Sequence, residues 1–144
     1  MKNLPDHYSI SLTRADMQVE AIHKYLSCDS YWAQGIPMDV VRRSIEGSLC
    51  AGVFYKDSQV GFARYITDAA TFAYLADVYV LADHGGQGLA RAMITALEQH
   101  DSLQDIRSWL LVTADAQGLY RTMGWQVHPQ PERVMQRLFP DIYK

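Results

Sequence analysis

The chain has 144 residues, of which 49% are hydrophobic and 20% are charged, and its formal net charge is −3. This length suits one ordinary domain with a sizeable core, and the composition excludes an intrinsically disordered chain. The negative charge argues against a nucleic-acid-binding protein that relies on attraction to phosphates. We therefore expect a single domain over residues 1–144 that binds no nucleic acid.

The cysteine content and the first residues of the chain indicate the cellular compartment in which the protein is expected. Met1 to Asp6 lack the apolar segment of a signal peptide, and no apolar stretch approaches the length of a membrane span. The two cysteines, Cys28 and Cys50, do not have the spacing of metal ligands. We expect a cytoplasmic protein with no bound metal and no membrane association, and we interpret Cys50 as a small core residue.

The hydrophobic pattern predicts strands and helices over most of the chain. In chain order we expect a strand over 8–13, helices over 16–26 and 38–46, a hairpin of strands over 49–55 and 59–66, a strand over 74–81, a helix after 88, a strand over 108–113, a short helix over 116–122 and a strand over 133–139. This order predicts an α/β (α+β) fold, in which helices cover both faces of a mixed, mostly antiparallel sheet of about six to seven strands.

Three glycines stand within four positions where the strand over 74–81 meets the following helix. They are Gly85, Gly86 and Gly88. Glycine lets the main chain turn sharply and lets a ligand approach it closely. Several N–H groups and the positive end of the helix dipole then face one spot, which suits an anion. A tight turn without a ligand is the alternative interpretation.

Three kinds of phosphate-binding loop can be compared with this one. A Walker A loop needs Gly-Lys-Ser or Gly-Lys-Thr, and neither occurs in the chain. A dinucleotide-binding fingerprint starting at Gly86 would have Arg91 where glycine or alanine is required, and the loop lies past the middle of the chain. The stretch from Gly85 to Ala90, GGQGLA, instead resembles the pyrophosphate loop of GNAT-superfamily acetyltransferases, [RQ]-x-x-G-x-[GA].

Two further segments carry the same resemblance. Val78-Tyr79-Val80 is similar to the family's central strand, whose main chain pairs with the pantetheine arm of acetyl-CoA. The segment from Ala116 to Trp125 resembles the pattern A-x-x-L-Y-x-x-x-G-[FW], and Ser30 to Gly35 is similar to a stretch in small bacterial members. The resemblance runs from about Tyr8 to Phe139. It implies the GNAT fold, acetyl-CoA (coenzyme A) as cofactor, and transfer of an acetyl group to an amine.

The resemblance also implies which residues contact the cofactor. They are Val78, Tyr79, Val80, Gly85, Gly86, Gln87, Gly88, Leu89, Ala90, Arg91, Thr113 and Leu119. Gly85 departs from the pattern, because the family usually has Arg or Gln there, and Thr113 stands where the family often has Asn. The loop must then rely on main-chain donors and on Gln87 and Arg91.

Two residues are candidates for proton transfer. Tyr120 matches the family's tyrosine near the coenzyme sulfur, a general acid, although an aromatic residue in a helix can also simply fill the core. Asp77 stands among apolar residues of the central strand, where a carboxylate must be paired, solvated or protonated. It is our first candidate for a base acting through water, and a structural hydrogen-bond acceptor is the alternative.

Three residues are candidates for binding the acceptor. Tyr31 and Trp32 lie between the first two helices, in the region that lines the acceptor pocket of this family, and two aromatic rings suit an apolar or cationic group. They could equally cover the core. Asp68 could bind the substrate, although a loop aspartate is more often a turn residue.

The sequence therefore predicts an acetyl-CoA-dependent N-acetyltransferase in which a primary amine of a small molecule or protein attacks directly in a ternary complex. A non-catalytic acyl-CoA sensor with the same fold is the alternative, and a nicotinamide-dependent oxidoreductase fits less well. We expect a monomer or a homodimer, and the sequence does not identify the amine.

Overall fold

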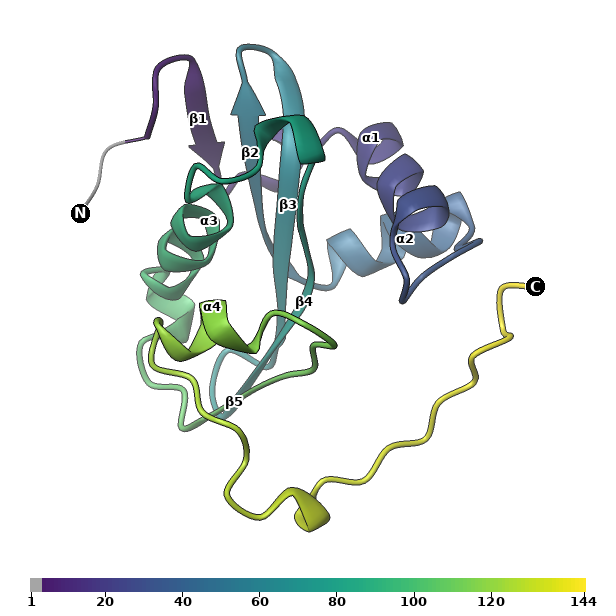
Figure 1. The fold of residues 1–144 in the computed structure, drawn as a ribbon, viewed down its shortest axis with the longest axis vertical. Coiled ribbons are helices and arrows are strands. Elements are labelled where there is room, and N and C mark those ends of the chain that lie inside the picture. Colours follow the sequence, from purple (N-terminus) through teal and green to yellow (C-terminus); the bar gives the residue numbers. More distant parts are fainter. Residues whose placement is uncertain (1–3) are drawn as a thin grey trace.

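The centre of the protein is a twisted β-sheet, seen in a computed structural model that describes residues 4–144 (Figure 1). Its five strands are β1 Tyr8–Ser11, β2 Leu49–Tyr55, β3 Ser58–Thr67, β4 Phe72–Val80 and β5 Ser108–Leu111. They lie side by side in chain order. The pairs from β1 to β4 are antiparallel, whereas β4 and β5 are parallel. The predicted mixed, mostly antiparallel sheet is confirmed.

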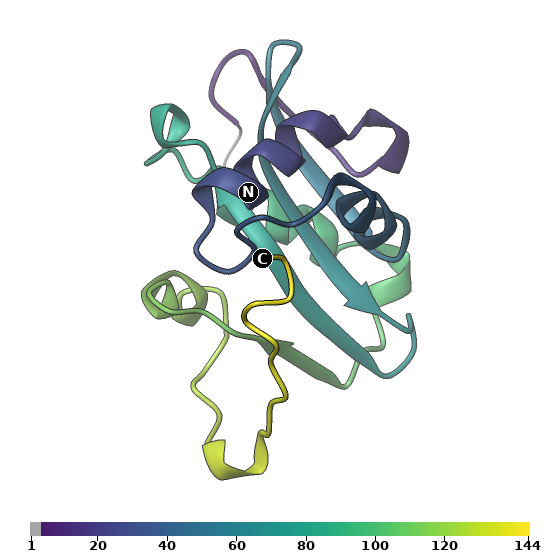
Figure 2. The same cartoon turned by 90° about the vertical axis from the view of Figure 1, so that its right-hand side faces the viewer.

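Helices cover both faces of this sheet (Figures 1 and 2). The helices are α1 Val19–Lys24, α2 Met38–Glu46, α3 Leu89–Glu98 and α4 Gln117–Arg121, with a π-helical turn over Tyr25–Asp29 and short 3₁₀ turns at Arg14–Asp16, Ala82–His84, Asp101–Leu103 and Pro131–Arg133. Helices α1 and α2 pack on one face, and α3 packs on the other. No helix within residues 4–144 combines the length and the apolar character that crossing a bilayer requires.

The apolar spacing of α3 explains why it lies against the sheet. Leu89, Met93, Ile94 and Leu97 are all buried, and this spacing places them on one stripe of an α-helix. They share a core with residues from β2, β3 and β4. Each such side chain stabilises the fold by about 1.5–3 kcal/mol when it is fully buried. This packing fixes the start of α3 relative to the end of β4.

A β-bulge interrupts β4 at Asp77. Phe62 of β3 pairs with Tyr79, and Arg64 pairs with Ala76, so one residue of β3 lies opposite two of β4. Asp77 has a φ of 55°, in the left-handed region that few residues other than glycine occupy. The extra residue inverts the alternation of side chains along the strand.

The inversion is visible in the two cores. Before the bulge, Leu75 belongs to the core under α3. After the bulge, Val78 packs against that same core, and Tyr79 is buried in the core under α1 and α2. A strand without the bulge would have placed Tyr79 on the same face as Leu75.

The parallel strands β4 and β5 separate after a short paired stretch. Their pairing covers only Phe72 to Leu75 and Ser108 to Leu111. Beyond Leu75, β4 continues to Val80 with β3 alone as its partner. The main chain from Ala76 to Val80 therefore has one open edge.

Two predicted elements differ in the structure. The helix expected over 16–26 begins only at Val19, because the N–H of Gln18 donates to the Gln59 side chain at 2.7 Å and the chain at Met17 is extended. The strand expected over 133–139 is absent, and the described residues form five strands where six to seven were predicted. Residues 126–144, which we call the C-terminal arm, instead run away from the body of the protein in an irregular course (Figure 1).

Candidate active site

The glycine loop presents its main-chain N–H groups without partners. Gly86 and Gly88 both have a φ of 76°, and Gly88 is the N-cap of α3. None of the six N–H groups from Gly86 to Arg91 donates a hydrogen bond within residues 4–144. A Cβ added at Gly86 or Gly88 would meet no heavy atom within 4 Å. The loop therefore has free donors and open space at the positive end of a helix dipole, an arrangement that suits an anion.

A pocket of about 290 Å³ lies in front of this loop. It is lined by Val80, His84, Gly85, Gly86, Gly88, Leu89, Ala90, Arg91 and Leu119. The structure thus brings together most of the residues that the sequence assigns to the cofactor. Val80 at the open end of β4 and Leu119 of α4 form apolar walls, and the bare loop forms the floor.

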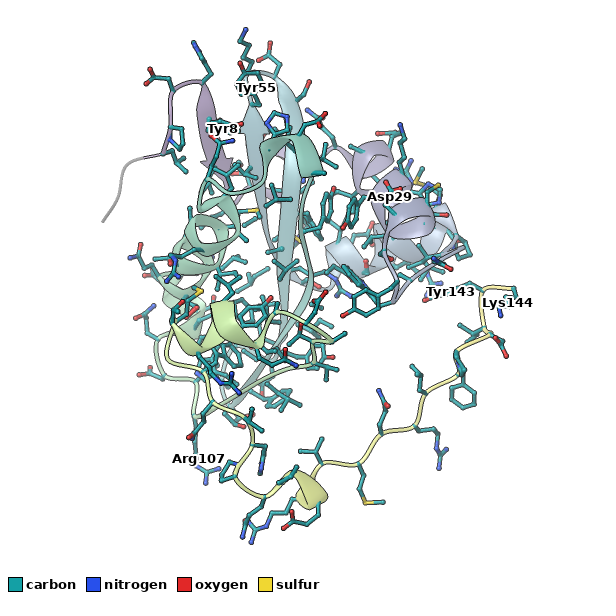
Figure 3. All side chains as sticks on the ribbon, in the orientation of Figure 1. Tyr8, Asp29, Tyr55, Arg107, Tyr143 and Lys144 are labelled. Carbon is teal, nitrogen blue, oxygen red and sulfur yellow. The ribbon has the colours of Figure 1, made fainter. Side chains whose placement is uncertain are left out.

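The polar side chains of the loop are held by other parts of the protein. The Gln87 amide donates to the Tyr8 hydroxyl at 3.0 Å, and that hydroxyl lies 2.6 Å from Nδ1 of His84. Tyr8 lies beside β2 (Figure 3). The guanidinium of Arg91 donates to the Thr122 hydroxyl at the end of α4. In this arrangement Gln87 and Arg91 brace the loop, and the donors left free in the loop are those of the main chain.

Gly85 has an ordinary backbone conformation. Its φ is −70° and its ψ is 164°, values that any residue adopts. A Cβ at this position would lie 3.3 Å from the carbonyl oxygen of Ala82, a close but adjustable contact. The absence of Arg or Gln at this position is therefore not imposed by the backbone.

Tyr120 projects from α4 into the core, and its ring lies 6.2 Å from that of Trp125 in an edge-to-face arrangement. Burial raises the pKa of Tyr120 above its usual value, with smaller contributions from Tyr31 and Asp115. Its hydroxyl has no hydrogen-bond partner within residues 4–144, yet no unpartnered side-chain oxygen there is fully enclosed. The hydroxyl therefore reaches accessible space and stays protonated at neutral pH.

Both oxygens of the Asp77 carboxylate are bound by protein donors. Oδ1 accepts a hydrogen bond from the Trp32 indole at 2.7 Å, and Oδ2 forms an ion pair with Nε of Arg64 at 2.8 Å. The Asp77 and Arg64 side chains are only 10% and 14% exposed. Asp77 thus ties the bulge to β3 and to the Trp32 loop, which favours the structural alternative over the proposed base.

Tyr31 and Trp32 bridge the open side of β4. The Trp32 indole reaches the bulge through Asp77, and the Tyr31 hydroxyl accepts a hydrogen bond from the N–H of Ala114, after β5, at 3.0 Å. The two rings meet edge to face at 4.9 Å and remain 61% and 41% exposed. They do not simply cover the core, and they lie where β4 and β5 separate.

The side chains of three predicted site residues lie outside the pocket of the glycine loop. Asp68 accepts hydrogen bonds from the Thr71 hydroxyl and from the N–H groups of Thr71, Ala70 and Phe72. These bonds close the β3–β4 turn and hold the pKa of its carboxyl below the usual range. This turn lies five residues of β4 before the bulge, roughly 16 Å at the rise of a strand. Asp68 is therefore a turn residue remote from the bulge.

The other two are Thr113 and Tyr79. The Thr113 hydroxyl accepts a hydrogen bond from the N–H of Ala116 at 3.1 Å, so it closes the turn that precedes α4. The Tyr79 ring is stacked on Tyr25 at 3.9 Å on the face away from α3, and its burial raises its pKa. The bulge explains this position of Tyr79, whose main chain alone borders the open edge.

Arg64 is the site residue that the sequence prediction missed. It stands in the middle of an apolar run of β3, as Asp77 stands in β4, and it also donates to the Ser48 hydroxyl at 2.9 Å. Two opposite charges within neighbouring strands of a hairpin were the signal, since an unpaired buried charge is costly.

Comparisons with known proteins agree with this geometry. A family model described as the acetyltransferase (GNAT) domain matches residues 47–127. A candidate acetyltransferase of Gibberella zeae is 35% identical over 135 residues, covering 78% of this chain and 75% of that protein. The crystal structure of a candidate GNAT-family acetyltransferase from Xanthomonas campestris pv. campestris matches with a TM-score of 0.92 and 42% identity, covering 98% of this chain and 99% of that chain.

A more distant match shows the fold alone. The aminoglycoside N-acetyltransferase AAC(6')-Iy in complex with CoA has a TM-score of 0.66 at 14% identity, covering 96% of this chain and 97% of that chain. The fold class expected from the sequence is confirmed by these matches. The chain is an acetyltransferase and belongs to the GNAT family.

Proposed function

We propose that this acetyltransferase moves an acetyl group from acetyl-CoA to a primary amine by direct attack in a ternary complex. The observation that carries the proposal is that two parts of the main chain without hydrogen-bond partners lie next to each other. The unpartnered N–H groups from Gly86 to Arg91 adjoin the pocket whose wall is Val80, at the end of the unpaired edge of β4. An anionic group would fit the free N–H groups, and an extended chain with amide groups attached to that anion would fit the unpaired edge of β4.

The residues present fit coenzyme A. Its diphosphate suits main-chain donors at a helix N-terminus, where Gly86 and Gly88 leave space that a side chain would fill. Its pantetheine amides suit the open edge of β4, because an extended chain can add to an unpaired strand. Leu119 and Val80 supply apolar contact on either side.

Tyr120 is proposed as the proton donor. When bound, acetyl-CoA supplies the acetyl group as a thioester. Tyr120 holds its proton at neutral pH because burial raises its pKa, and its hydroxyl is not engaged by another described residue. We assign it the protonation of the departing sulfur, a step for which a positioned acid typically contributes 10²–10⁴-fold.

The acceptor amine is proposed to bind beside Tyr31 and Trp32. Their exposed rings lie next to the separation of β4 and β5 and can contact an alkyl or cationic group through their faces. An alkylamine with a pKa near 10.4 is neutral in only about one molecule in 10³ at pH 7. Both oxygens of Asp77 already accept hydrogen bonds from protein donors, which argues against Asp77 as the group that takes the amine proton.

Turnover and binding measured together test the proposal. Coenzyme A should stabilise the protein thermally, and thiol release from acetyl-CoA should depend on an amine from a panel of polyamines, amino sugars, aminoglycosides and lysine peptides. Stabilisation without thiol release for any amine would favour an acyl-CoA sensor, the alternative that the occupied Asp77 and the glycine at position 85 support. Stabilisation by a nicotinamide dinucleotide but not by coenzyme A would refute both.

A further inference from the structure

The side chain of His84 lines the pocket of the glycine loop, beside the free main-chain donors. Among the described residues that line this pocket, only His84 and Arg91 have polar side chains, and none carries a carboxylate. Arg91 already donates one hydrogen bond to the Thr122 hydroxyl. An anion in the pocket would therefore lie close to the imidazole of His84.

His84 can reach an anion in this pocket through its ring alone. It ends the 3₁₀ turn Ala82–His84, and its main-chain N–H donates to the carbonyl oxygen of Leu81 at 2.9 Å. The N–H of Gly85 donates to the carbonyl oxygen of Ala82 at 3.1 Å, and Gly85 has no side chain. The imidazole is therefore the group through which this end of the loop can contact a ligand.

Two aromatic rings hold the imidazole in place. The His84 ring meets the Tyr8 ring edge to face at 5.7 Å and lies 5.3 Å from the Tyr55 ring, and the two tyrosine rings are 5.0 Å apart. Tyr8 belongs to β1 and Tyr55 to β2, and both lie at the same end of the sheet (Figure 3). The orientation of the imidazole is thus fixed by the sheet.

The hydrogen bonds of the Tyr8 hydroxyl determine which nitrogen of His84 carries a hydrogen. The hydroxyl has one hydrogen to donate. It accepts a hydrogen bond from the Gln87 amide at 3.0 Å, and its other partner within residues 4–144 is Nδ1 of His84 at 2.6 Å. The hydroxyl therefore donates to Nδ1, which is the bare nitrogen of a neutral imidazole. The ring hydrogen then lies on Nε2, which has no partner within residues 4–144.

We propose that the Nε2–H group of His84 donates a hydrogen bond to the diphosphate of coenzyme A. The inference rests on the proposed function, in which this pocket holds that diphosphate. A hydrogen bond to a charged oxygen is roughly twice as strong as one between neutral groups. Because Tyr8 already orients the ring, little side-chain freedom is lost when the ligand binds.

Two substitutions separate the two ring nitrogens. The side-chain amide of asparagine reaches about as far as Nδ1, and that of glutamine about as far as Nε2. His84→Asn should keep a partner for Tyr8 and lose the donor, which weakens coenzyme A binding roughly 10- to 100-fold. His84→Gln should keep the donor, with an affinity within about 5-fold of the wild type.

His128→Asn is the matched control for His84→Asn. It makes the same change at an exposed histidine that does not line the pocket, so the affinity for coenzyme A should not change. Calorimetry measures the affinity of each variant, and circular dichroism shows whether the fold is kept.

A truncated ligand identifies the group that His84 contacts. Dephospho-coenzyme A lacks the phosphate on the ribose and keeps the diphosphate. His84→Asn should lower the affinity for this ligand by the same factor as for coenzyme A. A factor that disappears with dephospho-coenzyme A would assign His84 to the ribose phosphate and overturn the proposal.

The tautomer of His84 can be measured without a ligand. In protein with isotope-labelled histidine, at mildly alkaline pH where histidine is neutral, a proton–nitrogen correlation spectrum distinguishes the two ring nitrogens. We expect a bare Nδ1 and a hydrogen on Nε2. A hydrogen on Nδ1 would overturn the proposal, since Nε2 would then have nothing to donate.

Two binding results would also overturn it. The first is an equal affinity of the wild type, His84→Asn and His84→Gln for coenzyme A. The second is a greater loss for His84→Gln than for His84→Asn, since the contact with Tyr8 would then matter and the donor would not. In both cases the wild type still binds coenzyme A and the proposed function stands. A wild type that binds no coenzyme A would refute the proposed function and this inference together.

Discussion

Replacing Tyr120 by phenylalanine removes one oxygen atom and keeps the aromatic ring. The ring makes the packing contacts, including the edge-to-face contact with Trp125, so these survive the change. The hydroxyl has no hydrogen-bond partner within residues 4–144, so its loss strands no buried donor or acceptor. We expect the free energy of unfolding to change by less than about 1 kcal/mol.

The expected loss of activity comes from proton donation alone. General-acid catalysis is worth about 10²–10⁴-fold, and a thiol with a pKa near 8.5 leaves without much help at neutral pH, which places the effect toward the low end. We therefore expect Tyr120→Phe to lower kcat by roughly 10- to 300-fold, with a smaller change in the KM for acetyl-CoA. Thiol release at saturating acetyl-CoA, with a preferred amine, measures both constants.

Tyr65→Phe is the matched control for this variant. Tyr65 is fully buried in the same core, and its hydroxyl contacts Glu98 at 3.5 Å, away from the pocket of the glycine loop. Its substitution should leave kcat within about two-fold of the wild type, because no proton would pass through it. Full activity in Tyr120→Phe would refute the assignment and leave Tyr120 as a core residue.

Four further predictions concern the loop, the bulge and pH. Gly88→Glu should abolish most coenzyme A binding, because it adds bulk and negative charge at an open position with a φ of 76°. Calorimetry measures the affinity, and an unchanged circular dichroism spectrum shows that the fold is kept. Unchanged affinity would exclude this loop as the diphosphate site. Gly85→Arg should tighten coenzyme A binding about 3- to 10-fold, because a cation about 6 Å from a phosphate gains roughly 0.7 kcal/mol per phosphate charge in water. The backbone conformation at position 85 accepts a side chain, so weaker binding in a folded variant would contradict this prediction. Asp77→Asn should lower kcat by the same factor at every pH if Asp77 positions the bulge, whereas a loss that shrinks as pH rises would identify it as the base. Burial raises the pKa of Tyr79, so its contribution to the free energy of unfolding should be constant below about pH 10 and fall above it, where the tyrosine of the unfolded chain ionises first. Between about pH 8 and about pH 11, denaturation should show a smaller decline in the free energy of unfolding for Tyr79→Phe than for the wild type.

The sequence predicted the elements whose ends carry their own signals. Helix α2 begins after Pro37 and ends before Gly47, and its observed bounds equal the predicted ones, because both residues act locally on the backbone. The glycine loop was predictable for the same reason. Its glycines stand between an apolar strand and an amphipathic helix, a spacing that favours an anion-binding loop, with a tight turn without a ligand as the alternative.

Features that depend on neighbours in space were less predictable. Asp77 and Arg64 meet only because the register of β3 on β4 brings them together, which no local pattern specifies. The segment over 133–139 has the residue types of a strand but no partner strand within residues 4–144, and a strand exists only as part of a sheet. The roles of Tyr120 and of the aromatic pair at Tyr31 and Trp32 remain predictions that the geometry supports.

The bulge at Asp77 couples the length of this part of the gene to its composition. Loss of the single codon for Asp77 would remove the extra residue and straighten β4, so Val78 and Val80 would keep the face toward α3 and Tyr79 would keep the face toward α1 and α2. The loss would instead remove a carboxylate and leave the guanidinium of Arg64, whose side chain is only 14% exposed, without its ionic partner. We expect homologues that lack a residue at this position to lack a basic residue at the position of Arg64 as well, whereas the β2–β3 turn at Asp57 should vary freely in length.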